Sequence, residues 1–100
     1  MNGPVRAQRA LVTGASRGIG AAIALRLAQD GCEVAIHYAR SEAAAREVAA
    51  ACSRLGVRAL TVAADLTSAQ EVERMRRELE RREFLPDILV NNAGVASYGL

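Results

Sequence analysis

Short hydrophobic runs alternate with segments of helical periodicity along the whole chain. Four runs rich in Val, Leu, Ile and Ala predict buried strands at residues 9–13, 33–38, 57–63 and 87–91. Between them, apolar residues recur every three or four positions, which predicts one helix in each interval. The predicted order is therefore strand and helix repeated three times, followed by a fourth strand.

The first two predicted helices have recognisable ends. In the first, apolar residues at Ile19, Ile23, Leu27 and Ala28 share one face, and Gly31 ends the pattern. In the second, Ser41 is a candidate N-cap and Gly56 a candidate C-terminal stop. Val48, Cys52 and Leu55 of that helix are expected to point inward.

The third predicted helix begins with a capping-box pattern. Ser68 is followed three residues later by Glu71, the arrangement in which each residue satisfies a backbone amide of the first turn. Val72, Met75 and Leu79 then share a face. Pro86 ends the segment, so the fourth strand follows immediately.

The apolar runs are nearly continuous and the connections are short, which is typical of a parallel sheet covered on both faces. Right-handed crossovers between such strands give a doubly wound α/β sheet of the Rossmann type. We expect residues 1–8 to form an N-terminal extension and residues 9–100 to form the β-α-β-α-β-α-β portion of a nucleotide-binding domain.

Composition narrows the function classes. The chain has 100 residues, three of them aromatic, and a formal net charge of +2, without the clustered basic face of a nucleic-acid-binding protein. Cys32 and Cys52 lack metal-ligand spacing, so we expect reduced, packed thiols. We see no signal peptide and no apolar run long enough to cross a bilayer, and so expect a cytoplasmic protein without a membrane partner.

A glycine-rich loop joins the first predicted strand to the first helix. Residues 13–20 read TGASRGIG. In this position Gly14 permits a tight turn, Gly18 lets the backbone approach a pyrophosphate, and Gly20 lets helix and strand pack closely. Free amide groups and the helix dipole would then face the phosphates. The alternative is a purely structural turn, because tight strand-to-helix connections also favour glycine.

The spacing of these glycines resembles the TGxxxGxG loop of the short-chain dehydrogenase/reductase family. The sequence NNAG at residues 91–94 resembles a second hallmark of that family, and Asp65 with Leu66 resembles a third. The resemblance extends from about Arg9 onward and is strongest to 3-oxoacyl-[acyl-carrier-protein] reductases, which act in fatty acid biosynthesis. Residues 95–100 depart from the commonest continuation in that group.

The resemblance implies a set of cofactor-binding residues. Asp65 would contact the adenine amino group, the Leu66 backbone the adenine ring, and residues 92–94 the ribose, whereas Asn91 is equally suited to a structural role. The complete predicted set is Gly14, Ser16, Arg17, Gly18, Ile19, Gly20, Arg40, Asp65, Leu66, Asn92, Ala93 and Gly94. No catalytic residue and no metal ligand is predicted.

The end of the second strand favours NADP(H) over NAD(H). A carboxylate there would bind the ribose 2′-hydroxyl of NAD, but the sequence is HYAR, and Arg17 lies in the facing loop. Two guanidiniums suit a 2′-phosphate, although both could be ordinary solvated side chains. His37 is the only histidine, and we interpret it as a partly packed strand-end residue rather than a catalytic one.

The resemblance implies an NADPH-dependent enzyme that reduces a carbonyl to an alcohol. The leading substrate is a 3-oxoacyl thioester on acyl carrier protein, and the alternative is a protein-bound or other small ketone. A non-catalytic NADP-binding sensor is a hypothesis of a different class. The family's full-length enzymes also suggest a homotetramer.

The family's chemistry requires an Asn, a Ser and a Tyr-x-x-x-Lys pair downstream of the NNAG motif. Tyr98 is followed by no such lysine, since the sequence contains none. We therefore expect residues 1–100 alone to catalyse no carbonyl reduction. We also expect the fourth strand to have an open edge, which favours association with other polypeptide.

Overall fold

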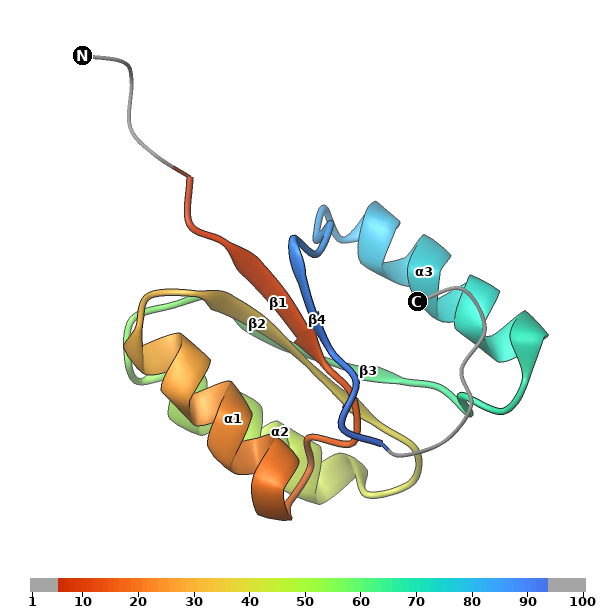
Figure 1. The fold of residues 1–100 in the computed structure, drawn as a ribbon, viewed down its shortest axis with the longest axis horizontal. Helices are drawn as coiled ribbons and strands as arrows, with labels where there is room; N and C mark the ends of the chain where they lie inside the picture. The colour runs from red at the N-terminus through yellow and green to blue at the C-terminus, as the bar shows by residue number, and fades with distance from the viewer. Residues whose placement is uncertain (1–5, 94–100) are drawn as a thin grey trace.

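A parallel four-stranded sheet with the strand order β3-β2-β1-β4 forms the centre of the protein (Figure 1). The computed structural model describes residues 6–93. The strands are β1 (Arg9–Val12), β2 (Glu33–Tyr38), β3 (Ala59–Ala63) and β4 (Ile88–Val90), and the helices are α1 (Gly18–Gln29), α2 (Glu42–Ser53) and α3 (Ala69–Arg81). This is the doubly wound, Rossmann-type arrangement that the sequence predicts.

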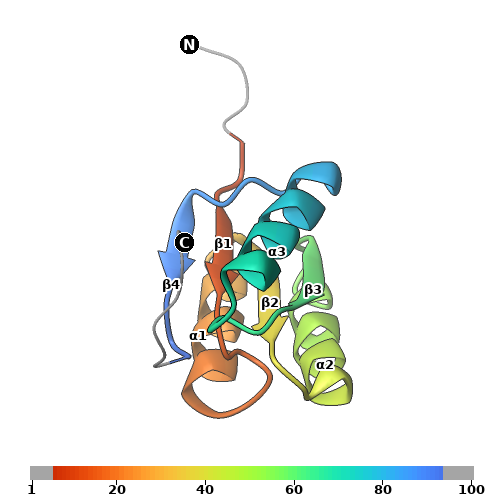
Figure 2. The ribbon, with the colours of Figure 1, turned by 90° about the vertical axis from the view of Figure 1, so that its right-hand side faces the viewer.

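The helices cover both faces of the sheet, with α1 and α2 on one face and α3 on the other (Figure 2). Successive strand residues therefore enter different cores. Ala10 and Val12 pack with residues of α1 and α2, whereas Leu11 packs with α3. This two-sided burial explains why the strands are hydrophobic at consecutive positions rather than at alternate ones.

Small side chains bring α1 and α2 close to the sheet and to each other. Ala24, Ala28 and Ala45 are buried, and the thiol of Cys52 lies 3.8 Å from the Ala24 carbonyl oxygen. Cys32 and Cys52 are both free and buried, as expected of packed thiols. None of the helices within residues 6–93 is long and apolar enough to span a membrane.

Three strand boundaries differ from the sequence-based expectation by one or two residues. β1 ends at Val12 rather than residue 13, β3 begins at Ala59 rather than residue 57, and β4 is shorter than the predicted 87–91. The differences occur where the chain turns into a loop; for example, the Asn92 amide bonds back to the Val90 carbonyl oxygen (3.1 Å).

The prediction that Leu55 points inward is wrong. Its side chain is 47% exposed, because α2 ends at Ser53 and Leu55 lies in the following turn, where its amide donates to the Cys52 carbonyl oxygen at 2.9 Å. Cys52 is fully buried and Val48 is partly buried against the same core, as predicted.

Side-chain and backbone bonds fix both ends of α3. The Ser68 hydroxyl accepts from the Glu71 amide at 3.2 Å, which confirms half of the predicted capping box. The other half differs, because the Ser68 amide donates to the Asp65 carbonyl and the Glu71 carboxylate pairs with Arg74. At the other end, Glu83 adopts a φ of 55°, the left-handed conformation that glycine commonly supplies there.

Ion pairs and backbone bonds hold the amino ends of the strands together. Asp87, just before β4, accepts from the Arg9 amide and from the Arg6 guanidinium, both at 2.9 Å. Arg9 in turn pairs with Glu33 at the start of β2, at 3.1 Å. These contacts hold β4, β1 and β2 in register at the amino end of the sheet, opposite the glycine loop.

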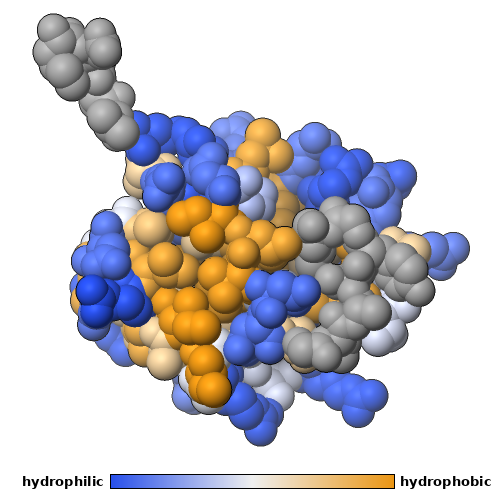
Figure 3. Space-filling model, in the orientation of Figure 1, coloured by the Kyte–Doolittle hydropathy of each residue, from blue (hydrophilic) through white to orange (hydrophobic). Residues whose placement is uncertain are grey.

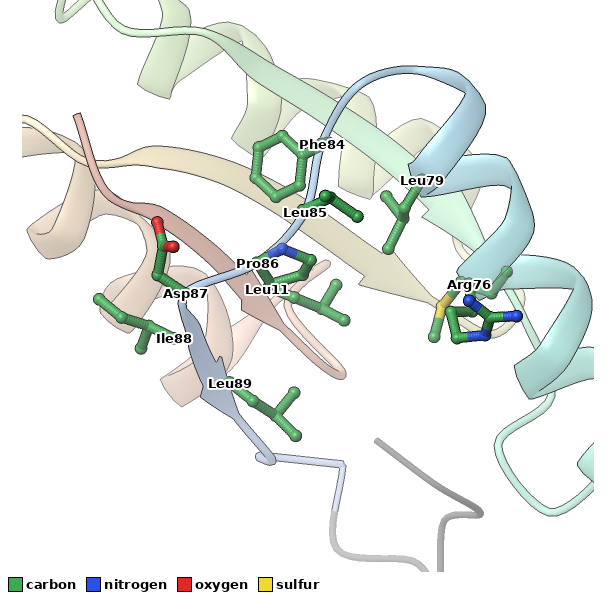
Figure 4. Close-up of a pocket in the computed structure, with 10 residues that line it drawn as sticks. Leu11, Arg76, Leu79, Phe84, Leu85, Pro86, Asp87, Ile88 and Leu89 are labelled. Carbon is green, nitrogen blue, oxygen red and sulfur yellow. The ribbon is translucent and has the colours of Figure 1, made fainter. Parts of the chain in front are cut away.

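The outer edge of β4 has no strand partner within residues 6–93, as expected. Leu89 on β4 is 40% exposed and Leu85 is 59% exposed. Figure 3 shows a broad apolar surface on the face of the molecule that is turned toward the viewer in Figure 1. Both leucines line an apolar groove of about 260 Å³ between α3 and β4 (Figure 4). Its floor includes Leu11, Met75 and Leu79.

Candidate functional site

A polar cavity of about 460 Å³ lies at the carboxyl ends of the strands. Its lining comes from the end of β2 and from the loops after all four strands: Gly14, Ser16, His37, Tyr38, Ala39, Arg40, Ser41, Asp65, Leu66, Thr67, Asn92 and Ala93. The chain leaves β1 toward β2 and β3 on one side, and the connection from β3 then crosses back to place β4 on the other side of β1. Open α/β sheets bind ligands at this kind of switch point.

The three loop glycines meet different local demands. Gly14 and Gly18 have φ values of 60° and 62°, which side chains rarely adopt. A Cβ on Gly20 would overlap the Gly14 carbonyl oxygen and lie 2.6 Å from Nδ2 of Asn92, whereas one on Gly18 would meet nothing within 4 Å. The turn and the close packing predicted for Gly14 and Gly20 are therefore present, and Gly18 has open space above it.

Helix α1 begins at Gly18 without a side-chain cap. Arg17 occupies the N-cap position in an extended conformation, makes no capping bond, and no acidic residue lies in the first turn. The amino end of a helix carries partial positive charge and orphan amide groups. This end of α1 is therefore suited to an anion, and Ile19, 73% exposed, lies within its first turn.

His37 joins the glycine loop to the end of β3. Its ring is 2% exposed; Nδ1 accepts from the Gly14 amide at 3.0 Å and Nε2 donates to the Ala64 carbonyl oxygen at 2.8 Å. Burial lowers the pKa of His37, and the bond to Ala64 opposes this more weakly. The residue is more deeply buried than the partly packed histidine expected from the sequence, and neither ring nitrogen faces open space.

The loop after β4 is fastened to the loop after β1. The Thr13 hydroxyl donates to the Asn91 side-chain oxygen and accepts from the Ala93 amide, each at 3.1 Å. Nδ2 of Asn92 donates to the Gly14 carbonyl oxygen at 3.1 Å. Asn91 thus has the structural contact considered for it, while Asn92 and Ala93 line the cavity. Gly94 lies outside the described residues, as do residues 95–100, which include Tyr98.

Arginines from two loops reach the mouth of the cavity. Arg40 lines it directly, and the exposed Arg17 donates to the hydroxyl of Ser41 at 2.5 Å. Ser41 occupies the predicted N-cap position of α2, but its side chain makes no capping hydrogen bond, so the prediction that it caps the helix is wrong. Its hydroxyl instead accepts from Arg17, and Ser41 lines the cavity.

Asp65 lines the cavity from the loop after β3. Its carboxylate accepts from the Thr67 amide at 2.9 Å and from the Thr67 hydroxyl at 2.6 Å. These bonds, with a smaller contribution from Arg40, lower the pKa of Asp65, so it is anionic at neutral pH. The Leu66 side chain is buried in the α3 core, so its backbone is the part available to the cavity.

Several cavity residues were not identified from the sequence. Ser41 and Thr67 are polar and adjacent to predicted residues, and Asp-x-Thr is a recognisable turn pattern that could have suggested Thr67. The pairing of Ser41 with Arg17 depends on how two loops meet in space, and neither local sequence reveals it.

Comparison with known proteins places this geometry in context. Residues 8–99 match the family model described as short chain dehydrogenase. The chain is 45% identical over 86 residues to the 3-oxoacyl-[acyl-carrier-protein] reductase FabG of Staphylococcus aureus, covering 86% of this chain and 35% of that protein. It is 42% identical over 95 residues to the hydroxynaphthalene reductase arp2 of Aspergillus fumigatus, covering 95% and 35%.

Solved structures give the same picture. The landomycin C-6 ketoreductase LanV, whose structure contains NADP and rabelomycin, superposes with a TM-score of 0.77 and 49% identity, over 92% of this chain and 40% of that one. The chain spans about 35% of the length of each of the two curated relatives, FabG and arp2.

Proposed function

Because the chain belongs to the short-chain dehydrogenase family, we propose that it is the NADP(H)-binding part of a reductase that converts a carbonyl to an alcohol. The observation that carries the proposal is the mouth of the polar cavity, where Arg17, Arg40 and Ser41 gather beside the end of β2 and no carboxylate takes the place that favours NAD.

The three residues have complementary chemistry for a phosphate. Guanidinium groups bind phosphate oxygens through paired, charge-assisted hydrogen bonds, and a serine hydroxyl adds a neutral donor. The Arg17–Ser41 bond holds one guanidinium at the cavity in advance. We propose that this group binds the 2′-phosphate of NADP(H), with Asp65 and the Leu66 backbone at the adenine.

The remaining parts of the proposed site follow the glycine loop. The uncapped start of α1 and the open space above Gly18 would accommodate the pyrophosphate, with Ser16, Ile19 and Gly20 in the same segment. Asn92, Ala93 and Gly94 are proposed at the ribose. When bound, the cofactor supplies a hydride; the residues of this chain hold and orient it.

The proposed substrate is a 3-oxoacyl thioester on acyl carrier protein, supported by the 45% identity to FabG. The similarity to LanV supports the alternative of another small ketone. Because the matched relatives are much longer, we propose that the Ser and the Tyr-x-x-x-Lys pair lie in polypeptide beyond these residues. If they do not, the protein is a non-catalytic nucleotide-binding sensor.

The test is a calorimetric titration of the full-length protein with NADPH and with NADH. Arg40→Ala should weaken NADPH binding about tenfold to a hundredfold, the range for one charge-assisted contact, while NADH binding changes little. Arg46→Ala, on the exposed side of α2 where Arg46 pairs with Glu42, is the matched control and should change neither.

Equal effects of Arg40→Ala on both nucleotides would contradict the 2′-phosphate site. Failure of the wild-type protein to bind any nicotinamide nucleotide would overturn the proposed function as a whole.

A further inference from the structure

We propose that His37 is a positioning residue that makes nicotinamide-nucleotide binding depend on pH, because only its uncharged ring can hold the Gly14 amide and with it the glycine loop. The inference rests on the proposed function, since it concerns the same cavity. It assigns His37 no contact with the reacting atoms.

The two ring bonds define one protonation state. The Gly14 amide is a donor, so Nδ1 must be an acceptor without a proton, and the Ala64 carbonyl is an acceptor, so Nε2 must carry the proton. The ring is thus the neutral tautomer with hydrogen on Nε2. A second proton would place an N–H on Nδ1 directly against the Gly14 N–H, 3.0 Å away, so this bond cannot survive protonation.

The bond to Gly14 lies at the centre of the proposed pyrophosphate site. The Gly14 carbonyl accepts from Asn92, and the next residue, Ala15, donates its amide to the His37 backbone carbonyl at 3.0 Å. Gly14 is therefore held from β2 on one side and from the β4 loop on the other. Loss of the His37 bond removes one of these supports, at the residue where the loop turns toward α1.

The His37 ring is too closely packed to accept a second proton without moving. It is 2% exposed, and burial already lowers the pKa of His37. Protonation is therefore coupled to a displaced loop, and binding of the nucleotide, which needs the loop in place, opposes protonation. The dissociation constant should rise as pH falls through the His37 pKa, which lies below the ordinary value of 6.5.

Other charged and titratable groups lie around this position. They are Tyr38 at the end of β2, Arg40 in the loop after it, Arg17 in the glycine loop, Asp65 after β3, and Arg74 on α3, which donates to the Ala63 carbonyl oxygen. The hydrogen bonds from Thr67 lower the pKa of Asp65 from 3.8, away from the ordinary histidine value of 6.5. His37 is the group in this set whose protonation directly breaks the bond to Gly14.

The experiment measures NADP⁺ binding by calorimetry between pH 5 and 8, using the full-length wild-type protein and two variants. His37→Asn retains an acceptor near the position of Nδ1 without a titratable ring, and His37→Leu removes both bonds while keeping an apolar side chain. Circular dichroism at each pH restricts the comparison to folded protein. The 2′-phosphate of NADP⁺ also titrates near pH 6, but it does so equally with all three proteins.

We expect wild-type affinity to fall with acid, by up to tenfold per pH unit beyond the fall that either variant displays. His37→Asn should bind almost as well as wild type at pH 7.5, and His37→Leu about tenfold more weakly. Either variant alone supplies the comparison if the other does not fold. Parallel pH profiles for wild type and variant would overturn the inference, whereas absence of wild-type binding at pH 7.5 would instead overturn the proposed function.

Discussion

The side-chain amide of Asn92 donates to the carbonyl oxygen of Gly14 across 78 positions of sequence, at 3.1 Å. The bond closes the space between the β1 and β4 loops at the point where α1 packs against them. Gly20 lies under this contact and has no room for a side chain. The carboxyl edge of the sheet is therefore a connected set of loops, in which a change at one glycine is felt at another strand.

Gly20→Ala should destabilise the protein and weaken nucleotide binding together. The new methyl group would overlap the Gly14 carbonyl oxygen, and overpacking of this kind costs about 1–3 kcal/mol. Gly18→Ala is the matched control: it has open space around it and should cost only about 1 kcal/mol of backbone strain. Urea unfolding measures the first effect and NADPH titration the second. Equal loss of stability in the two variants would contradict the steric argument.

Ser41→Ala and Ser68→Ala should have opposite effects on folding stability and on nucleotide affinity. Ser68 accepts from the Glu71 amide, so its loss should cost about 1 kcal/mol of folding free energy, typical of an N-cap, without affecting nucleotide affinity. Ser41 makes no capping bond and instead contacts Arg17, so its loss should leave stability nearly unchanged and weaken NADPH binding severalfold. If Ser41→Ala destabilises the fold as much as Ser68→Ala, the assignment of its hydroxyl to the cavity is wrong.

The stabilisation that Asp87 gives to the fold should be lost at low pH. Its bonds to the Arg9 amide and then to Arg6 lower its pKa from 3.8. A group with a lowered folded-state pKa stabilises the fold fully above its unfolded pKa, and this stabilisation is lost as pH falls through the lower, folded value. Asp87→Asn should therefore be less stable than wild type at pH 7, and the gap should narrow below pH 4. Denaturant unfolding at pH 7 and pH 3 measures it; a constant gap would count against the ion pair.

The open edge of β4 should drive association of a polypeptide comprising residues 1–100. Unpaired strand edges with exposed apolar side chains recruit other chains, and Leu89 lies on this edge, 40% exposed. Leu89→Lys should shift the polypeptide toward monomer in sedimentation experiments. Leu55→Lys, at a comparably exposed leucine beyond α2, is the control and should not. A monomeric wild-type polypeptide would refute the prediction.

The periodicity of the sequence was sufficient to predict the order of the elements and the parallel sheet. Runs such as 33–38 can be buried on both sides only between two helical layers, and that is where β2 lies. The prediction for Leu55 was wrong because apolar spacing continued past Ser53 while the helix did not. Similarly, no glycine in the sequence marks the left-handed residue after α3, because Glu83 occupies that position. The Arg58 guanidinium donates to the Glu83 carbonyl oxygen at 3.1 Å.

The candidate site was predictable where one short segment carries all its parts, as in the glycine loop. It was less predictable where two loops meet. The Ser41 hydroxyl could cap α2 or contact Arg17, and only the spatial approach of the β1 and β2 loops decides between them. His37 illustrates the same limit: its position at a strand end was evident, but its bond to Gly14 depends on strand order and register.

The two ends of the sheet hold different kinds of contact, and this separation has a consequence for protein engineering. At the amino ends, Asp87, Arg9 and Glu33 clamp the strands through charge, whereas the carboxyl ends contain the polar cavity. Substitutions that raise thermal stability can therefore be sought at the amino ends, and substitutions that change the specificity of the proposed nucleotide site at the carboxyl ends. Combining one of each should give nearly additive effects, since the sheet's length keeps the altered groups apart.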